Sequence, residues 1–179
     1  MQEEVALDYI FRHSKNFNVV SLGYLSRYAF EHHHNNKNYY MTGSMGLSLP
    51  FAIGLSKSSS NTFNLIIGEG SLFMNLGALS SAYLAKNLNV FVIDNQSHNT
   101  TGGQETNFST DSLREFVLKS GFNSFNIYSK ESELTNVDVN QKGKNFHVFS
   151  VRRMKHKPMR INIKLEDIHN NFKNELKEN

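Results

Sequence analysis

Two apolar strands that each end in a polar turn constrain the fold of this chain more than any other feature. The first is Leu65-Ile66-Ile67, which reads as a short buried strand and runs directly into the turn Gly68-Glu69-Gly70-Ser71. A helix is predicted to begin near Leu72, so the positive end of its dipole would face whatever binds in the turn. The turn is therefore a candidate phosphate site.

The second strand, residues 90–93, ends at Asp94-Asn95, and Asn95 follows Glu69 by 26 positions. Neighbouring strands of a parallel sheet end side by side at one edge, and ligands of such sheets bind outside the carboxyl ends of the strands. We therefore expect Glu69 and Asn95 to lie close together, each offering a side-chain oxygen. Mg²⁺ prefers octahedral oxygen ligands and often shares phosphate oxygens with one or two protein groups. The segment thus predicts a site for a diphosphate and Mg²⁺.

The rest of the chain alternates between apolar strands and helical patterns. Such alternation predicts an α/β fold, a mostly parallel sheet with helices on both faces. The expected strands are residues 17–21, 64–67, 89–94, 125–128 and 146–151. The expected helices are residues 5–11, 24–30, 47–55, 72–86 and one that Asp111 caps, which runs to Lys119 and stops at Gly121.

Composition limits the classes of function. A chain of 179 residues is one domain of ordinary size, and its net charge of +3 does not by itself argue for nucleic acid or a membrane surface. No apolar run approaches the roughly 18 residues that span a bilayer. The absence of cysteine suits a reducing compartment, and the N-terminal residues lack the basic and apolar regions of a signal peptide. We expect a cytoplasmic protein.

Several motifs together resemble the thiamine diphosphate-dependent decarboxylases, in particular the phosphonopyruvate and sulfopyruvate decarboxylases. The resemblance is carried by Gly43-Ser44-Met45-Gly46, by the Gly-Glu-Gly-Ser turn, by Gly23 to Arg27, and by the run Asp-Asn-Gln-Ser-His-Asn-Thr-Thr-Gly-Gly-Gln from Asp94 to Gln104. It covers residues 1–151, which would form the diphosphate-binding (PP) domain of the family. Residues 152–179 would be a basic extension, either part of the same domain or an exposed helix from Leu165.

The resemblance implies a role for each matching residue. Glu69, the side chain of Asn95 and the backbone carbonyl of Ser97 would bind Mg²⁺. Met45 would wedge beneath the thiazolium ring, and the carbonyl of Gly43 would accept a hydrogen bond from the pyrimidine amino group. The implied contacts of thiamine diphosphate are Gly43, Ser44, Met45, Gly68, Gly70, Ser71, Asn95, Ser97 and Thr101. The family has Asp where this chain has Glu69, which is one methylene longer, so the loop must shift or the metal site must loosen.

One component of such an active site has no counterpart in this sequence. Thiamine enzymes activate the cofactor with a glutamate from a pyrimidine-binding domain about as large as this whole chain. We therefore expect a partner subunit that supplies this glutamate, in a heterotetramer. The implied reaction is decarboxylation of a 2-oxo acid, with phosphonopyruvate favoured and sulfopyruvate as the alternative. His98 would contact the substrate, with Asn99, Thr100, Thr101 and Gln104 as further candidates.

Other interpretations remain open for parts of the sequence. The chain could belong to another thiamine enzyme, such as one like acetolactate synthase, or it could be a non-catalytic scaffold in which Glu69 marks a decayed metal site. His32-His33-His34 looks like a metal cluster, but adjacent side chains of a helix point in different directions, which favours a solvated stretch. Arg152, Arg153, Lys155 and Lys157 form a basic run that favours a solvated or subunit-facing surface over phosphate binding.

Overall fold

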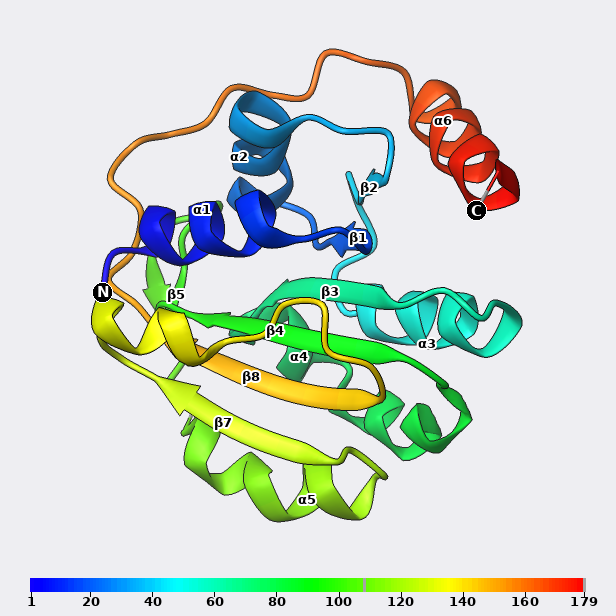
Figure 1. Ribbon diagram of the computed structural model, residues 1–179. Helices are drawn as coiled ribbons and strands as arrows, with labels where there is room; N and C mark the ends of the chain where they lie inside the picture. Colours follow the sequence, from blue (N-terminus) through cyan, green and yellow to red (C-terminus); the bar gives the residue numbers. More distant parts are fainter. Residues whose placement is uncertain (108, 179) are drawn as a thin grey trace.

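The computed structural model describes residues 1–107 and 109–178, and its central feature is a parallel sheet (Figure 1). The sheet has six strands in the order β2-β1-β3-β4-β8-β7, and every neighbouring pair is parallel. The strands are β1 (Phe17–Val20), β2 (Asn38–Tyr40), β3 (Phe63–Gly68), β4 (Leu88–Asp94), β7 (Ser124–Tyr128) and β8 (Lys144–Ser150). The predicted α/β fold with a parallel sheet is confirmed.

Helices cover both faces of the sheet. They are α1 (Glu3–His13), α2 (Tyr24–His33), α3 (Ser48–Ser58), α4 (Glu69–Met74), α5 (Arg114–Lys119) and α6 (Leu165–Glu178), with 3-10 helices η1 (Leu76–Leu84), η2 (Thr110–Leu113) and η3 (Glu131–Asn136). Because side chains alternate along a strand, the buried residues separate into two apolar clusters. One lies between the sheet and α3, η1, α5 and α6, and the other between the sheet and α1, α2 and η3.

Five features differ from the sequence-based expectation. The expected helix 72–86 was wrong, because the chain leaves helical geometry at Asn75 (φ −142°, ψ 53°), which separates α4 from η1. The short edge strand β2 and the 3-10 helix η3 were not expected. Neither was the two-stranded hairpin of β5 (Ser97–His98) and β6 (Gln104–Glu105). The expected helix before Gly121 is split into η2 and α5, and the side chain of Asp111 lies outside the described residues.

A row of polar side chains, all buried except half-buried Ser124, crosses the whole sheet near the amino ends of its strands. The row consists of Asn38, Asn18, Asn64, Asn89, Asn145 and Ser124, which occupy matching register positions on the six strands. Each member is joined to the next by a side-chain hydrogen bond of 2.7–3.2 Å. A slip of one residue in any strand would place an amide in the apolar layer, so this asparagine ladder fixes the register.

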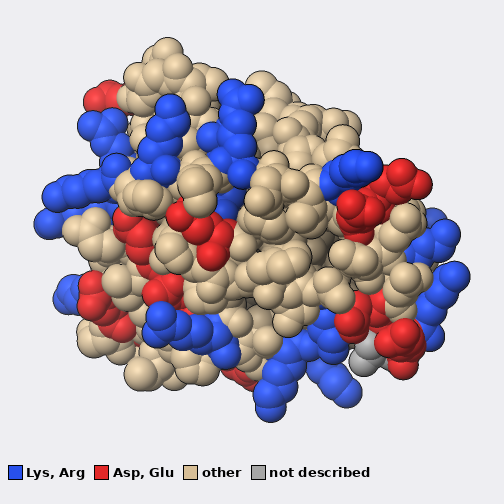
Figure 2. Space-filling model, turned by 90° about the horizontal axis from the view of Figure 1, so that it is seen from above, with Lys and Arg blue, Asp and Glu red and all other residues tan. Residues whose placement is uncertain are grey.

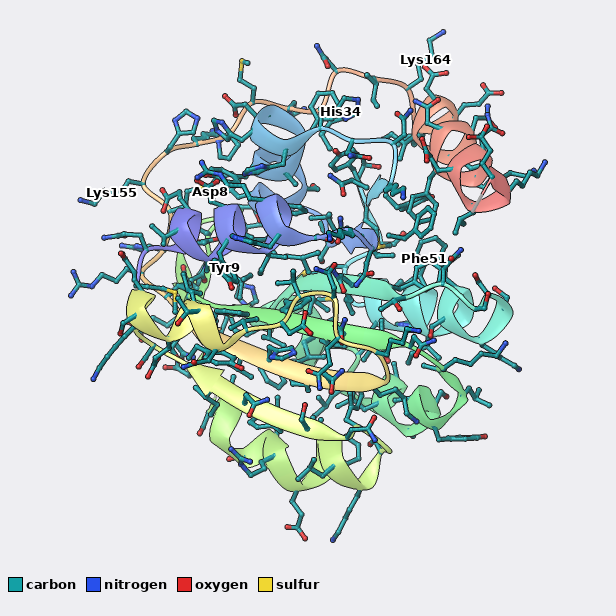
Figure 3. The ribbon with its side chains drawn as sticks, in the orientation of Figure 1. Asp8, Tyr9, His34, Phe51, Lys155 and Lys164 are labelled. Atoms are coloured by element: carbon teal, nitrogen blue, oxygen red, sulfur yellow. The ribbon has the colours of Figure 1, made fainter. Side chains whose placement is uncertain are left out.

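Hydrogen bonds of α1 attach it to the elements beside it. The hydroxyl of Tyr9 donates to the carbonyl of Val137, and Asp8 accepts from the hydroxyl of Tyr28 and lies 2.7 Å from Nε2 of His33. Figure 3 shows Asp8 and Tyr9 on α1, which lies against α2 above the sheet. These contacts hold the first helix over the sheet, with its amino end near the end of β8.

Residues 152–164 lead from β8 across the α1–α2 face to α6 (Figure 1). The helix is not wholly exposed, because Ile168 and Phe172 are buried. The ring of Phe172 makes edge contacts with Phe17 and Tyr39, at centroid distances of 5.5 and 5.4 Å. In Figure 2, Lys and Arg lie interspersed with Asp and Glu on this side of the molecule, so no large area of one sign forms there.

Within the described residues, no helix is long and apolar enough to cross a bilayer.

Candidate functional site

A cleft opens where the carboxyl ends of β1, β3 and β4 meet, and its volume is about 550 Å³ when the open space at its mouth is included. The turn after β3 and the loop after β4 form two of its walls, and the segment after β1 forms the third. Among its lining residues are Met45, Gly68, Glu69, Gly70, Ser71, Asn95, Ser97 and His98. The cleft lies at the edge of the sheet that the sequence predicts for a ligand.

The structure brings Glu69, Asn95 and Ser97 together around one backbone amide. The N–H of Ser97 donates to Oε1 of Glu69 at 2.9 Å and to Oδ1 of Asn95 at 3.0 Å. Both oxygens therefore lie about 3 Å from the same nitrogen and no more than about 6 Å from each other. The two oxygens therefore converge on one point of the cleft, as ligands of one ion would have to, although their residues follow different strands.

The surroundings of Glu69 favour a bound cation. Its side chain is buried, and burial raises the pKa of the carboxyl, to which the negative charge of nearby Asp94 adds. Hydrogen bonds from Thr106 Oγ1 and the Ser97 N–H oppose this rise and favour the ionised form. A divalent ion would offset the cost of two acidic groups in a buried place.

Two further observations in this loop fit a ligand site. The hydroxyl oxygen of Ser97 is buried and has no hydrogen-bond partner among the described residues. The next residue back, Gln96, has a φ of 55°, in the left-handed region that non-glycine residues rarely adopt. The donor set and the strained loop therefore fit a hard divalent cation with a phosphate ligand.

The glycine turn approaches the loop after β4 closely. A Cβ atom on Gly70 would lie 2.6 Å from Cε1 and 2.8 Å from Nδ1 of His98. Only glycine allows the turn and the imidazole to be this close without a shift of one of them. His98, predicted from the sequence as a substrate contact, thus lies directly beside the predicted diphosphate turn.

Ser71 connects the turn to two other segments. Its hydroxyl accepts a hydrogen bond from the N–H of Gly46 at 3.2 Å and lies 3.2 Å from Oγ of Ser21, at the end of β1. Met45 lines the cleft beside Ser71, as its predicted role requires. Gly43 and Ser44 do not line this cleft, and instead border a separate cavity beside α6.

The remaining predicted residues divide between the cleft and the hairpin. Asn99 and Thr100 line the cleft, and the methyl group of Thr100 lies 3.0 Å from where a Cβ of Gly23 would stand, which explains the glycine there with its φ of +94°. Thr101 and Gln104 are exposed at the tip of the β5–β6 hairpin, where their side chains lie 3.4 Å apart.

Sequence reasoning missed Glu3, whose side chain also lines the cleft. It is 1% exposed, and Oε2 accepts hydrogen bonds from Nδ2 of Asn95 at 3.0 Å and from the N–H of Met154 at 2.9 Å. Burial raises the pKa of this carboxyl, and the two hydrogen bonds oppose the rise. No local pattern marks the residue, because its partners are 92 and 151 positions away in the chain.

The histidine run and the basic run have separate locations. His33 pairs with Asp8 and His34 with the hydroxyl of Tyr40, whereas exposed His32 lies near Glu31 and His156. The three histidines therefore do not form one cluster. Arg152 and Arg153 border a second cavity next to the hairpin, and Nη1 of Arg153 lies 3.3 Å from the position of a Cβ on Gly103.

Comparison with known proteins agrees with this geometry. Residues 19–147 match the family model described as the C-terminal TPP binding domain of thiamine pyrophosphate enzymes. A thiamin diphosphate-dependent enzyme described from an X-ray structure of a Mycobacterium smegmatis protein superposes with a TM-score of 0.59 at 18% identity. That match covers 87% of this chain and 32% of the other, and it supports the fold.

The curated relatives include decarboxylases of two substrates. The sulfopyruvate decarboxylase subunit beta of Methanococcus maripaludis is 28% identical over 89% of this chain and 88% of its own length. The corresponding subunit of Methanocaldococcus jannaschii is 34% identical over 59% of this chain and 57% of its own length.

A phosphonopyruvate decarboxylase of Streptomyces hygroscopicus is 28% identical over 65% of this chain, which spans only 30% of that protein. The family match, the parallel sheet and the paired oxygens at the ends of β3 and β4 lead to one conclusion. The chain belongs to the thiamine pyrophosphate enzymes and has the fold of their C-terminal TPP binding domain.

Proposed function

We propose that this chain is the diphosphate- and metal-binding subunit of a two-chain thiamine diphosphate-dependent decarboxylase that acts on sulfopyruvate. The observation that carries the proposal is the shared hydrogen bonding of Glu69 and Asn95 to the Ser97 N–H, which sets two ligand oxygens beside the glycine turn. Residues 1–151 would hold the cofactor, and residues 152–179 would complete the fold around the α1–α2 face.

Different residues of the cleft would bind the metal ion, the diphosphate and the thiazolium ring. Glu69, the Asn95 side chain and the Ser97 carbonyl would hold Mg²⁺, and Gly68, Gly70 and Ser71 would hold the diphosphate. Met45 would support the thiazolium ring. Thiamine diphosphate would supply a nucleophile for the ketone carbon and a cationic ring that takes up the electron pair left when CO₂ departs. The chain's own contribution is orientation of this group and exclusion of water around the buried carboxylates.

A partner subunit would complete the active site. The chain spans 88% of a relative that is named as a beta subunit, which supports a protein made of two kinds of chain. The partner would supply the activating glutamate and part of the substrate pocket. We propose a heterotetramer, with the partner's pyrimidine-binding domain placed over the cleft that Met45 and Glu69 line.

The choice of substrate rests on the relatives rather than on the cleft. The Methanococcus maripaludis subunit matches 89% of this chain and 88% of its own length, whereas the Streptomyces hygroscopicus phosphonopyruvate decarboxylase matches 65% of this chain and only 30% of its own length. Phosphonopyruvate, which the sequence motifs favoured, is therefore the second candidate. Both substrates end in a tetrahedral anion, for which His98, Asn99 and Thr100 are the candidate donors within the cleft.

The test is turnover by the complex of this chain with a pyrimidine-domain subunit. CO₂ release would be measured with sulfopyruvate, phosphonopyruvate and pyruvate, in the presence of thiamine diphosphate and Mg²⁺. We expect the highest kcat/KM for sulfopyruvate and loss of activity in Glu69→Gln. Glu105→Gln is the matched control, because Glu105 is an exposed carboxylate on β6 of the same loop region.

The outcomes separate the proposals. Preferred turnover of phosphonopyruvate would retain the family mechanism but change the substrate. Cofactor binding without turnover of any of the three acids would support a scaffold subunit. Absence of cofactor binding in the complex would overturn the proposed function altogether.

A further inference from the structure

We propose that Glu3 is a positioning residue for the metal site, whose carboxylate holds the Asn95 side-chain amide in the orientation that presents Oδ1 beside Glu69. The inference rests on the proposed function, because it assigns the Asn95 oxygen to a divalent ion. It concerns a residue of α1 that belongs to none of the motifs of the glycine turn or the loop after β4. The evidence is that the hydrogen-bonding groups around the Asn95 amide can act either only as donors or only as acceptors.

The Glu3 carboxylate and the Met154 N–H together determine where the nitrogen of the Asn95 amide lies. Oε2 of Glu3 lies 3.0 Å from Nδ2 of Asn95 and 2.9 Å from the N–H of Met154. An ionised carboxylate can only accept hydrogen bonds, and a backbone N–H can only donate one. The amide nitrogen of Asn95 must therefore be the atom that faces Glu3.

The Ser97 N–H and the Glu69 carboxylate determine where the oxygen of the Asn95 amide lies. Oδ1 of Asn95 lies 3.0 Å from the N–H of Ser97, and that same N–H donates to Oε1 of Glu69. If the Asn95 amide rotated by half a turn, its NH₂ group would face the Ser97 N–H and its oxygen would face the Glu3 carboxylate. Both contacts would then be repulsive, and buried groups would lose their partners. Only one orientation satisfies both ends of the amide.

Glu3 is itself held firmly in place. It is 1% exposed, and its backbone N–H donates to the carbonyl of Arg152 at 3.1 Å. The N–H of Arg152 in turn donates to the carbonyl of Met1 at 2.9 Å. These bonds join the start of the chain to the segment after β8, so the carboxylate has little freedom to turn away from Asn95. Partners of this kind orient metal ligands, and their loss typically weakens metal binding about 10-fold to 100-fold.

A substitution of similar length that removes the acceptor tests the orientation directly. In Glu3→Met, no acceptor remains for Nδ2 of Asn95 or for the N–H of Met154, both of which donate to Oε2 of Glu3 in the wild type, so the Asn95 amide is free to turn. We expect the affinity for Mn²⁺ in the presence of thiamine diphosphate to fall about 10-fold to 100-fold, measured from the free-ion signal in electron paramagnetic resonance. Glu4→Met on the same helix is the control, because Glu4 is only half-buried and its side chain makes no hydrogen bond to another residue that the structure describes, so its affinity should equal that of the wild type.

A second substitution distinguishes positioning from a merely structural role. In the double variant Glu3→Met with Asn95→Asp, the new carboxylate has two equivalent oxygens, so one of them faces the Ser97 N–H in either orientation and no partner is needed to orient it. The net charge is that of the wild type. We expect the double variant to recover most of the lost Mn²⁺ affinity. If Glu3 only attached residues 152–154 to α1, the second substitution would not restore metal binding.

A second readout needs no metal or cofactor. The side-chain amide protons of Asn95 should exchange slowly with solvent in the wild type and in Glu4→Met, and rapidly in Glu3→Met, as measured by nuclear magnetic resonance. Wild-type protein that binds Mn²⁺ no better than Glu3→Met, with equal amide exchange, would overturn this inference and leave the proposed function intact. A complex of the wild-type chain with its partner subunit that does not bind Mn²⁺ with thiamine diphosphate would overturn both.

Discussion

Replacement of Asn89 by alanine should destabilise the protein by about 3 kcal/mol, because Asn89 lies at the centre of the asparagine ladder. Its side chain is fully buried and makes three hydrogen bonds, to Oδ1 of Asn64 at 3.0 Å, to the carbonyl of Gln141 at 3.0 Å, and from Nδ2 of Asn145 at 2.9 Å. A buried hydrogen bond contributes about 1 kcal/mol net, and the three together give the expected loss.

The loss of unfolding free energy in Asn89→Ala is limited by the hydrogen bonds that its former partners keep. Oδ1 of Asn64 still accepts from Asn16 at 3.2 Å, and Nδ2 of Asn145 still donates to the carbonyl of Lys142 at 3.2 Å. These two partners are therefore not left wholly unsatisfied, which keeps the expected value near that sum rather than well above it. A loss of this size would lower Tm by roughly 6–12 °C in a domain of this length.

The measurement is urea unfolding followed by far-UV circular dichroism. Asn89→Leu fills most of the space without restoring any hydrogen bond, so it should remain about 2 kcal/mol or more below the wild type. Asn170→Ala, on the exposed surface of α6, is the control and should change stability by less than about 0.5 kcal/mol. If Asn89→Ala lost less than about 1 kcal/mol, the ladder would not contribute to stability as argued.

Two other predictions concern the site and the response to pH. Gly70→Ala should weaken thiamine diphosphate binding at least about tenfold, because its Cβ would lie 2.6 Å from the His98 ring. In the control Gly77→Ala, the new Cβ has no atom within 4 Å, and the variant should bind the cofactor normally. Equal affinities of the two variants in calorimetry would contradict the argument from the close approach of Gly70 and His98. Burial lowers the pKa of His147 to about 4. The unfolded chain, with a pKa near 6.5, therefore binds a proton that the folded chain does not, and stability should fall as the pH falls from about 6.5 to about 4. Between pH 7.5 and pH 5 the fall should be about 2 kcal/mol as measured by urea unfolding, and it should be smaller in His147→Phe; equal pH dependence would show that His147 does not titrate in this way.

The sheet and the core of the site were accessible to sequence reasoning because their signals are local. Runs such as Leu65-Ile66-Ile67 are apolar throughout, which is typical of parallel strands buried on both faces. Glu69 and Asn95 each follow such a run directly, and β3 and β4 are neighbours in the sheet. Their proximity at 2.9 and 3.0 Å from the Ser97 N–H agrees with the prediction that they lie together.

Elements that depend on distant partners were not accessible. The break at Asn75 interrupts a stretch of small and apolar residues that any helix could contain, so no local signal marks it. β2 is three residues long and is held by pairing with β1. Gly43 and Ser44 share a motif with Met45, but the chain turns there and places them at a different cavity beside α6.

The sequence alone determined the class of sheet, the position of the glycine turn and the pair of oxygen-bearing side chains beside it, because periodicity and spacing along the chain fix strand ends and the edge at which they meet. Only the tertiary structure decided which groups surround that pair. The Glu3 carboxylate, the close approach of His98 to Gly70 and the ladder from Asn38 to Ser124 each join residues far apart in the chain. Such contacts depend on the polarity and shape of groups that meet only after folding, so local sequence patterns do not predict them.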